Sequence, residues 1–213
     1  MKPLRKKPKT REEWLSLRKS GIGASESAAV VGLSPWMTAS ELYEIKTGLK
    51  QAKDLSDNEE VSRGVRMENP LRELYKSQHP DYKVVHHPYD MLYQKERPWM
   101  FATLDGEVKD SDKRSGIIEI KTASPNGKAG WAKWNEQVPE TYFMQCCHQL
   151  LASGYDFVDL FAALINREDD ITIRTYHFER SDLEEDMAWL LEKETEFWNN
   201  VQNQSVPPLT FVF

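Results

Sequence analysis

The chain has 213 residues, of which 39% are hydrophobic and 29% are charged. This size suits one domain with a substantial core, and no apolar run approaches the roughly 18 residues of a membrane span. The only two cysteines, Cys146 and Cys147, are adjacent, which argues against a structural disulfide. Together with the absence of a secretory apolar segment near the start, this predicts a cytoplasmic protein from a reducing compartment.

The charge of the chain is unevenly distributed. The formal net charge is −6 and the pI is near 5.5, although a nucleic-acid binder needs Lys and Arg at its contact surface. Six cations and no acids lie in residues 1–11, whereas Glu179–Glu196 holds eight acids and two cations. Such polarity allows a basic binding surface and an acidic outer wall, although a basic segment can also be a solubilising arm. We expect a basic arm at 1–11, one domain at 12–205 and a tail at 206–213.

The first part of the chain is predicted to be helical. Capping boxes begin helices after Thr10 and Thr38, and Gly48 should end the second of these. A helical turn of small residues is expected at 25–31. A longer helix is predicted over 60–78, which Pro70 should bend or restart.

The pattern then changes to strands. Strands are predicted at Tyr82–Met91, Trp99–Val108 and Gly116–Thr122, and a helix after Pro139 should end before Gly154. Two more strands are expected at 157–165 and 171–178, followed by a helix that a capping box at Ser181 begins. This order predicts an α/β fold with a mixed central sheet flanked by helices, rather than a doubly wound fold.

Three charged residues on two neighbouring strands suggest a metal site. Asp105 ends one predicted strand, and Glu119 and Lys121 in the next project from the same face because side chains alternate along a strand. Carboxylate oxygens suit a hard cation such as Mg²⁺, and a nearby ammonium can hold or deprotonate an attacking water. The alternative is an ordinary ion pair between Glu119 and Lys121 on a solvated strand surface.

Other polar residues could join this site. Glu68 lies just before Pro70 and could reach over the sheet, although it could also pair with Arg72 on the helix surface. Tyr142, Gln145 and Gln149 share one helix face and could contact metal-bound water or phosphate, unless that face is merely solvated.

A second group of residues suggests an anion site. Ser25 begins a helical turn whose free N–H groups favour an anion, and Arg18 offers a forked phosphate donor. Alternatively, Ser25 only caps the turn and Arg18 is a surface charge. Four tryptophans could stack on unpaired bases, although Trp is more often a core residue; they are Trp36, Trp99, Trp131 and Trp134.

Five ordered blocks of residues resemble the YqaJ-like viral recombinases of the lambda exonuclease family, within the PD-(D/E)xK nuclease superfamily. The blocks are Trp14-x-x-x-Arg18 followed by Gly23-Ala24-Ser25-Glu26, then Gly64-x-x-x-Glu68-Asn69, then Asp105-Gly106, then Glu119-x-Lys121, and finally Tyr142-x-x-Gln145. Together they span most of the chain and are far more specific than any one of them. The resemblance implies a restriction-endonuclease-like core.

The resemblance also implies roles for individual residues. It implies Asp105, Glu119 and the Ile120 carbonyl as Mg²⁺ ligands, with Mn²⁺ able to substitute, and Lys121 as the residue that positions or activates water. Glu68 and Gln145 would support the metal site, and Arg18 and Ser25 would hold the 5′-phosphate, with Tyr142 also on the DNA. The implied activity is a 5′-to-3′ exonuclease of phage or prophage recombination in the bacterial cytoplasm. It would act on double-stranded DNA ends as a homotrimer and leave a 3′ overhang for a single-strand annealing protein.

The chain departs from the pattern of the family at two places. Leu104 precedes Asp105 where the name of the superfamily has a proline, and Gln145-Cys146-Cys147 replaces the Gln-x-Gln of some relatives. Any role of the second glutamine is therefore lost or passes to Gln149. Two other functions stay open: a structure- or sequence-selective endonuclease with the same site, and a DNA-end-binding module without catalysis.

Overall fold

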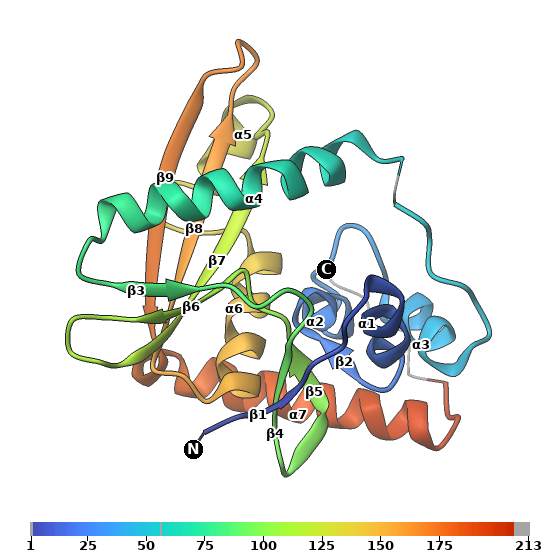
Figure 1. The fold of residues 1–213 in the computed structure, drawn as a ribbon. Helices are drawn as coiled ribbons and strands as arrows, with labels where there is room; N and C mark the ends of the chain where they lie inside the picture. Colours follow the sequence, from blue (N-terminus) through green and yellow to red (C-terminus); the bar gives the residue numbers. More distant parts are fainter. Residues whose placement is uncertain (1, 56, 207–213) are drawn as a thin grey trace.

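The computed structural model describes residues 2–55 and 57–206 of the chain (Figure 1). Its α-helices are α1 (Arg11–Arg18), α2 (Ser27–Val30), α3 (Ala39–Thr47), α4 (Glu59–Gln78), α5 (Gly127–Ala132), α6 (Glu140–Ser153) and α7 (Glu184–Gln202). Its strands are β1 (Leu4–Lys6), β2 (Ile22–Gly23), β3 (Lys83–Val85), β4 (Met91–Gln94), β5 (Arg97–Ala102), β6 (Gly106–Lys109), β7 (Ser115–Ala123), β8 (Phe157–Ile165) and β9 (Ile171–Glu179). Short 3₁₀ helices cover Ala24–Glu26 and Arg180–Leu183. No helix in the described part of the chain is both long and apolar enough to span a membrane.

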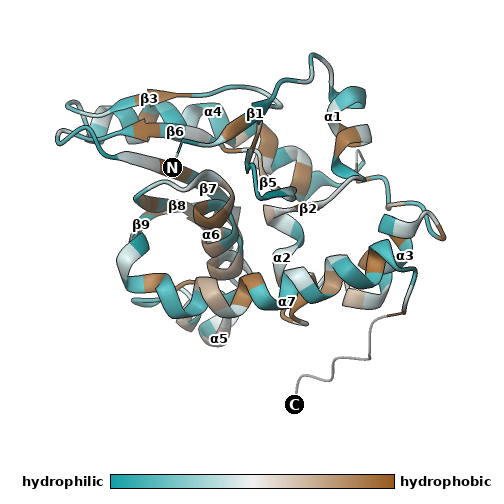
Figure 2. Ribbon diagram, turned by 90° about the horizontal axis from the view of Figure 1, so that it is seen from below, coloured by the Kyte–Doolittle hydropathy of each residue, from teal (hydrophilic) through white to brown (hydrophobic). Residues whose placement is uncertain are grey.

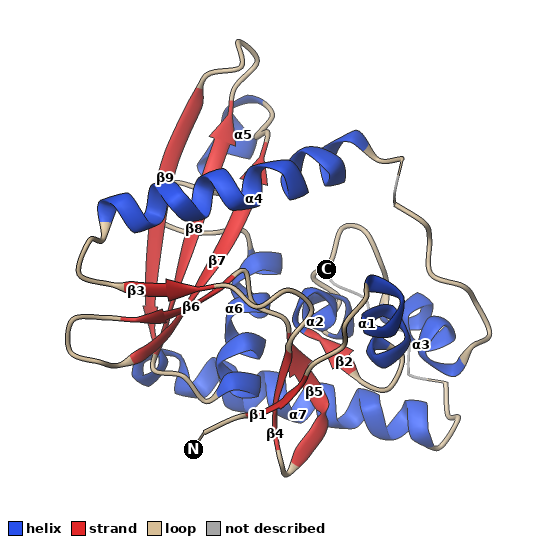
Figure 3. Ribbon diagram, in the orientation of Figure 1, coloured by secondary structure: helices blue, strands red, loops and turns tan. Residues whose placement is uncertain are grey.

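The strands form two mixed sheets (Figure 3). The larger has the order β3-β6-β7-β8-β9, in which only β7 and β8 run parallel, and the smaller has the order β1-β4-β5-β2. The predicted mixed α/β class is thus confirmed. The strands predicted at Tyr82–Met91 and Trp99–Val108 were wrong in extent, because each is split into two strands that belong to different sheets.

Helices cover both faces of the larger sheet. All nine residues of β8 are buried, as expected for a strand with helices on both sides. From α4, Leu71 and Tyr75 pack with Ile118 and Phe161 on one face. On the other face lies α6, which is coloured as mostly apolar in Figure 2 and also packs against α7. The strand β7 is therefore enclosed between α4 and α6.

Local capping signals predicted most helix ends. Thr10 accepts a hydrogen bond of 3.2 Å from the Glu13 N–H at the start of α1, and Gly48 ends α3 at a φ of 79°. However, α4 continues through Pro70 without restarting. The ring of a proline removes one helical hydrogen bond, and the packing of the following turns on the sheet offsets that loss. The predicted capping box at Ser181 also does not form, because a 3₁₀ turn precedes α7 there.

Part of the basic N-terminal segment is built into the smaller sheet. Leu4–Lys6 pairs antiparallel with β4, and Arg5 donates to Asp90 at 2.9 Å and to both carboxylate oxygens of Glu107 at 2.7 and 2.8 Å. The charge of Arg5 is thus balanced by these two acids, and the positive charge of the segment comes from its other cations. The predicted tail lies outside the described residues apart from Val206.

A buried carboxylate on β8 gives the fold a pH-dependent contribution to stability. Asp159 accepts hydrogen bonds from the Tyr75 hydroxyl and from His177 Nδ1, the latter at 2.6 Å, while His177 Nε2 lies 2.9 Å from Glu179. Partial burial alone would lower the pKa of His177, but the hydrogen bonds to Glu179 and Asp159 outweigh it and raise the pKa. Protonated His177 therefore stabilises the folded state at acidic pH.

We expect the free energy of unfolding to fall as the pH rises from about 6.5 through the raised pKa of His177. The folded state binds the proton more tightly than the unfolded state, so this stabilisation is complete below about pH 6.5 and is then lost. The ring is half-exposed, so solvent screening limits the effect to about 1 kcal/mol or less. Urea unfolding of wild type and of His177→Gln between pH 5.5 and 8.5 measures it, and an unchanged pH profile in the variant would refute this role.

Candidate metal and DNA site

Glu119 and Lys121 lie on the face of β7 that α6 covers. Glu119 is only 2% exposed, and its Oε1 lies 2.6 Å from Lys121 Nζ. The neighbours Ile118 and Ile120 point to the opposite face, against α4. The two charged residues thus share one face as predicted. The alternative of an ion pair on a solvated surface does not hold, because a carboxylate this deeply buried needs partners inside the protein.

Two amides from α6 hold the Glu119 carboxylate. Gln145 Nε2 donates to Glu119 Oε1 at 2.6 Å, and Gln149 Nε2 donates to Oε2 at 2.5 Å. Gln145 Oε1 also accepts from Lys121 Nζ at 2.9 Å. Gln149 is fully buried, so this face of α6 is not the solvated face considered as the alternative. Gln149 thereby supplies a second amide on Glu119, in a chain that lacks the Gln-x-Gln of some relatives.

Asp105 lies in the bend where the chain passes from β5 into β6. Its Oδ2 accepts a hydrogen bond of 2.8 Å from the Ile120 N–H of β7, and its carbonyl accepts one of 2.7 Å from Arg72 Nε of α4. The next residue, Gly106, has no room for a side chain, because a β-carbon there would lie 2.6 Å from Ile118 Cγ2. Asp105 is therefore held through its carboxylate and through its carbonyl, next to the strand that carries Glu119.

Burial and neighbouring negative charge raise the pKa of Asp105 and of Glu68. Burial and then the charge of Glu119 raise the pKa of Asp105 well above its usual range, and Glu68 adds to this effect. Burial also raises the pKa of Glu68, and Glu119 adds to it, although Arg72 opposes the shift. Burial alone would lower the pKa of Lys121, but the charges of Glu119 and Asp105 outweigh it and raise the pKa. The site thus concentrates negative charge that a cation would neutralise.

The donor set fits a hard divalent cation. The described residues contain no group of three or more His, Cys, Asp or Glu side chains placed to enclose an ion. Asp105 and Glu119 offer carboxylate oxygens, and Gln149 Oε1 is a buried oxygen without a hydrogen-bond partner in the described structure. Mg²⁺ binds oxygen ligands and usually keeps several waters, so it does not need a complete protein cage. This set favours Asp105 and Glu119 as ligands, with Glu68 acting through its charge.

The predicted anion site also comes together. Arg18 Nη2 donates to Ser25 Oγ at 3.2 Å, and the guanidinium lies 4.9 Å from the Trp14 ring centroid. Gly23 leaves space for this arrangement, because a β-carbon there would lie 2.9 Å from Arg18 Nη1. Trp14 Nε1 donates to Thr103 Oγ1 at 2.9 Å. This bond ties α1 to the segment that leads into Asp105.

The sequence did not reveal a buried lysine beside this anion site. Lys46 Nζ donates to the Arg18 carbonyl at 2.8 Å and to both oxygens of Glu26 at 2.8 and 3.0 Å, and Glu26 lies 3.3 Å from Arg18 Nη2. Two cations thus face one carboxylate, and the group keeps a net positive charge that suits a phosphate. Lys46 is far from Arg18 along the chain, so no spacing signal could have found it.

We expect Gln149→Leu to weaken metal binding and DNA cleavage by about 10- to 100-fold, because groups that orient metal ligands have effects of that size. Leucine fills similar space but leaves Glu119 Oε2 without the amide donor. Isothermal titration with Mn²⁺ and cleavage rates measure the loss. Gln202→Leu, at an exposed position of α7, is the matched control, and wild-type metal affinity in Gln149→Leu would contradict this role.

Solved structures share the fold of this chain. An alkaline exonuclease from Laribacter hongkongensis, LHK-Exo, superposes with a TM-score of 0.70 at 20% identity, covering 91% of this chain and 94% of that one. The structure of LHK-Exo in complex with dAMP gives a TM-score of 0.71 at 21% identity over the same shares. At these identities the likeness establishes the fold, including the restriction-endonuclease-like core expected from the sequence.

Sequence comparisons identify the family. The chain is 28% identical over 191 residues to the uncharacterized protein YqaJ of Bacillus subtilis (strain 168). That match covers 90% of this chain but 56% of the relative, so the chain spans little more than half the length of the relative. The model of the YqaJ-like viral recombinase domain matches residues 13–156, which include every predicted site residue. The chain therefore belongs to the family of YqaJ-like viral recombinase domains.

Proposed function

We propose that this protein is a Mg²⁺-dependent exonuclease that degrades one strand of linear double-stranded DNA from its 5′ end. The observation that carries the proposal is the convergence of Asp105, Glu119 and Lys121 beside one buried strand, with amide support from α6. Family membership and the shared fold with an alkaline exonuclease support it. The resulting 3′ overhang would serve a single-strand annealing protein in recombination.

The residues divide the chemistry between them. Asp105, Glu119 and the Ile120 carbonyl would hold the metal, which supplies charge neutralisation at the scissile phosphate and a more acidic water. Lys121 Nζ, which lies 2.6 Å from Glu119 Oε1 and donates to Gln145 Oε1 at 2.9 Å, would hold and orient the attacking water. The water oxygen bonds to phosphorus and gives one proton to solvent, while the bond to the 3′ oxygen of the terminal nucleotide breaks and that oxygen takes a proton from solvent.

The anion site fits repeated cleavage. Each cut releases a 5′-mononucleotide and leaves a new 5′-phosphate on the next nucleotide, so Arg18 and Ser25 can hold the shortened strand in the same way. LHK-Exo was crystallised with dAMP, a compound of the same class as the expected product. A homotrimer with a basic channel would reconcile DNA binding with the net charge of −6. Light scattering of the purified protein tests that assembly.

The experiment that tests the function uses linear duplex DNA labelled at one end or the other. Incubation with Mg²⁺ should release the 5′ label first, and EDTA should stop the release. Covalently closed circles should stay intact, whereas their cleavage would indicate an endonuclease. If the protein binds DNA ends but releases no nucleotide in Mg²⁺ or Mn²⁺, it is a DNA-end-binding module without catalysis.

Substitution of Arg18 should discriminate between two kinds of DNA end. We expect Arg18→Gln to lower kcat/KM about 10- to 100-fold on 5′-phosphorylated ends, because a charged hydrogen bond to phosphate is lost. Ends with a 5′-hydroxyl should suffer much less. Lys19→Gln, which removes the neighbouring exposed cation, is the control. Equal losses on both kinds of end would contradict a role of Arg18 in holding the 5′-phosphate.

A further inference from the structure

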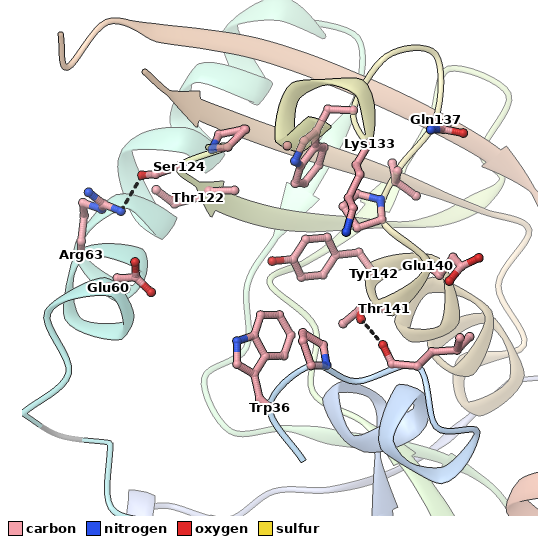
Figure 4. A pocket seen from close by; sticks show the side chains of 18 residues that line it. Trp36, Glu60, Arg63, Thr122, Ser124, Lys133, Gln137, Glu140, Thr141 and Tyr142 are labelled. Carbon is pink, nitrogen blue, oxygen red and sulfur yellow. Dashed lines mark hydrogen bonds between the residues drawn. The ribbon is translucent and has the colours of Figure 1, made fainter. Parts of the chain in front are cut away.

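A pocket adjoins the candidate metal site on the far side of the Tyr142 ring (Figure 4). Its volume is about 650 Å³, within the range of small-molecule sites, and α4, α5, α6 and the segment after α2 surround it. The ring of Tyr142 lies 5.0 Å from Lys121 Nζ and also lines the pocket. Thr122, the residue after Lys121, lines it as well. The pocket thus includes the residue that directly follows Lys121, the residue that would hold the attacking water.

One wall of the pocket presents unused hydrogen-bond donors. Arg63 Nη2 donates to Ser124 Oγ at 2.9 Å, while Arg63 Nε is shielded from solvent and has no partner within the described structure. Thr122 Oγ1 is likewise shielded and without a partner there. Buried polar atoms normally have partners, so two such atoms on one wall indicate a ligand that supplies acceptors. Lys133 also lines the pocket, while Glu60 lies beside Arg63 on α4 and Glu140 lies near Thr141 on α6 (Figure 4).

The opposite wall presents an aromatic face. Trp36 is 70% exposed, and its ring centroid lies 6.3 Å from that of Tyr142. The other tryptophans considered for base stacking are less exposed: Trp134 is 3% exposed, and Trp99 stacks on Trp198 at 6.2 Å. The segment that carries Trp36 is tied to α6, because Thr141 Oγ1 donates to the Leu33 carbonyl at 2.8 Å. An exposed indole on an anchored segment is suited to hold a flat, apolar ring.

We propose that this pocket binds one unpaired nucleotide of the DNA next to the scissile position. Its base stacks on Trp36, and its phosphate accepts hydrogen bonds from Arg63 Nε and Thr122 Oγ1. Acceptor oxygens and a flat ring occur together in a nucleotide, which matches the two walls. This inference rests on the proposed nuclease function and adds a device for opening the duplex end, because stacking on Trp36 offsets the lost base pair.

The test compares variants that remove one wall at a time. Trp36→Ala should raise the Kd for a duplex with a two-nucleotide 5′ overhang about 5- to 100-fold in EDTA, and Trp36→Phe should keep most of the affinity. Thr122→Val, which removes only the hydroxyl, and Arg63→Gln should each raise the Kd at least about 5-fold. The controls are Trp189→Ala and Arg66→Gln, which remove an exposed indole and an exposed guanidinium outside the pocket. Circular dichroism of each variant reports its folding.

A second readout separates base capture from a merely structural role. DNA with 2-aminopurine at the terminal position should lose fluorescence on binding to wild type but not to Trp36→Ala. A mismatch at the end of the duplex should recover most of the cleavage rate lost in Trp36→Ala, since the base is already unpaired. The inference fails if Trp36→Ala and Thr122→Val bind and cleave like their controls while wild type is active. If wild type binds these ends but releases no nucleotide, the proposed nuclease function is refuted. The proposed nucleotide pocket is still tested in that case by the binding and fluorescence measurements.

Discussion

Replacing Asp105 by asparagine is expected to lower the cleavage of linear duplex DNA by at least about 10³-fold. Asparagine keeps the shape of the side chain and an oxygen that can accept the hydrogen bond from the Ile120 N–H. It removes the negative charge that would bind the metal. Since burial and Glu119 raise the pKa of Asp105, loss of its charge should leave the metal-free protein as stable as wild type or slightly more stable.

Thermal unfolding with and without Mg²⁺ separates loss of metal from loss of fold. A ligand at 100 times its Kd stabilises the folded state by about 2.7 kcal/mol, so the Tm of wild type should rise with Mg²⁺ while that of Asp105→Asn stays constant. Asp112→Asn, in the exposed hairpin loop, should respond like wild type. A normal rate of cleavage by Asp105→Asn would remove this residue from the metal site.

Replacing Lys121 by methionine should lower cleavage by about 10²- to 10⁴-fold, the range found for residues that handle the proton or the water of a reaction. It should also destabilise the metal-free protein by about 3–5 kcal/mol, because Glu119 is buried and loses its cation. Methionine preserves most of the side-chain volume, so this loss reflects charge rather than packing.

Mg²⁺ distinguishes the two effects of this substitution. If Lys121 acts on the attacking water, saturating Mg²⁺ should restore the Tm of Lys121→Met, since the metal replaces the lost positive charge, without restoring cleavage. Lys128→Met, which removes an exposed lysine on α5, is the control. Recovery of both the Tm and the rate would show that Lys121 only balances charge.

Local sequence signals predicted the elements whose ends depend on neighbouring residues. The capping oxygens at Thr10 and Thr38 mark helix starts, and the continuous apolar run of β8 marks a buried strand. The sequence could not show the split of the strand predicted at Trp99–Val108. The two halves pair with different partners, β4 and β2 for one and β3 and β7 for the other. Which partner a strand finds depends on the tertiary fold.

The candidate site was foreseen where its residues share one element. Glu119 and Lys121 follow from strand alternation, and Gln145 and Gln149 follow from the helical period. The contact between Arg18 and Ser25 also agrees with the expected anion site. Residues brought in from distant segments gave no such signal. The tie from Arg72 to the Asp105 carbonyl and that from Lys46 to Glu26 join segments that only folding brings together.

The bend between the two sheets carries Asp105 and orders this side chain before a metal ion binds. A carboxylate on a flexible loop must give up its rotational freedom when the cation arrives, which weakens binding. Here the backbone of Asp105 is clamped by Arg72 and its side chain by the Ile120 N–H before any ion is present. The conformational entropy of Asp105 is therefore lost once, when the protein folds. The protein can then exchange its cation between reaction cycles without ordering this side chain again.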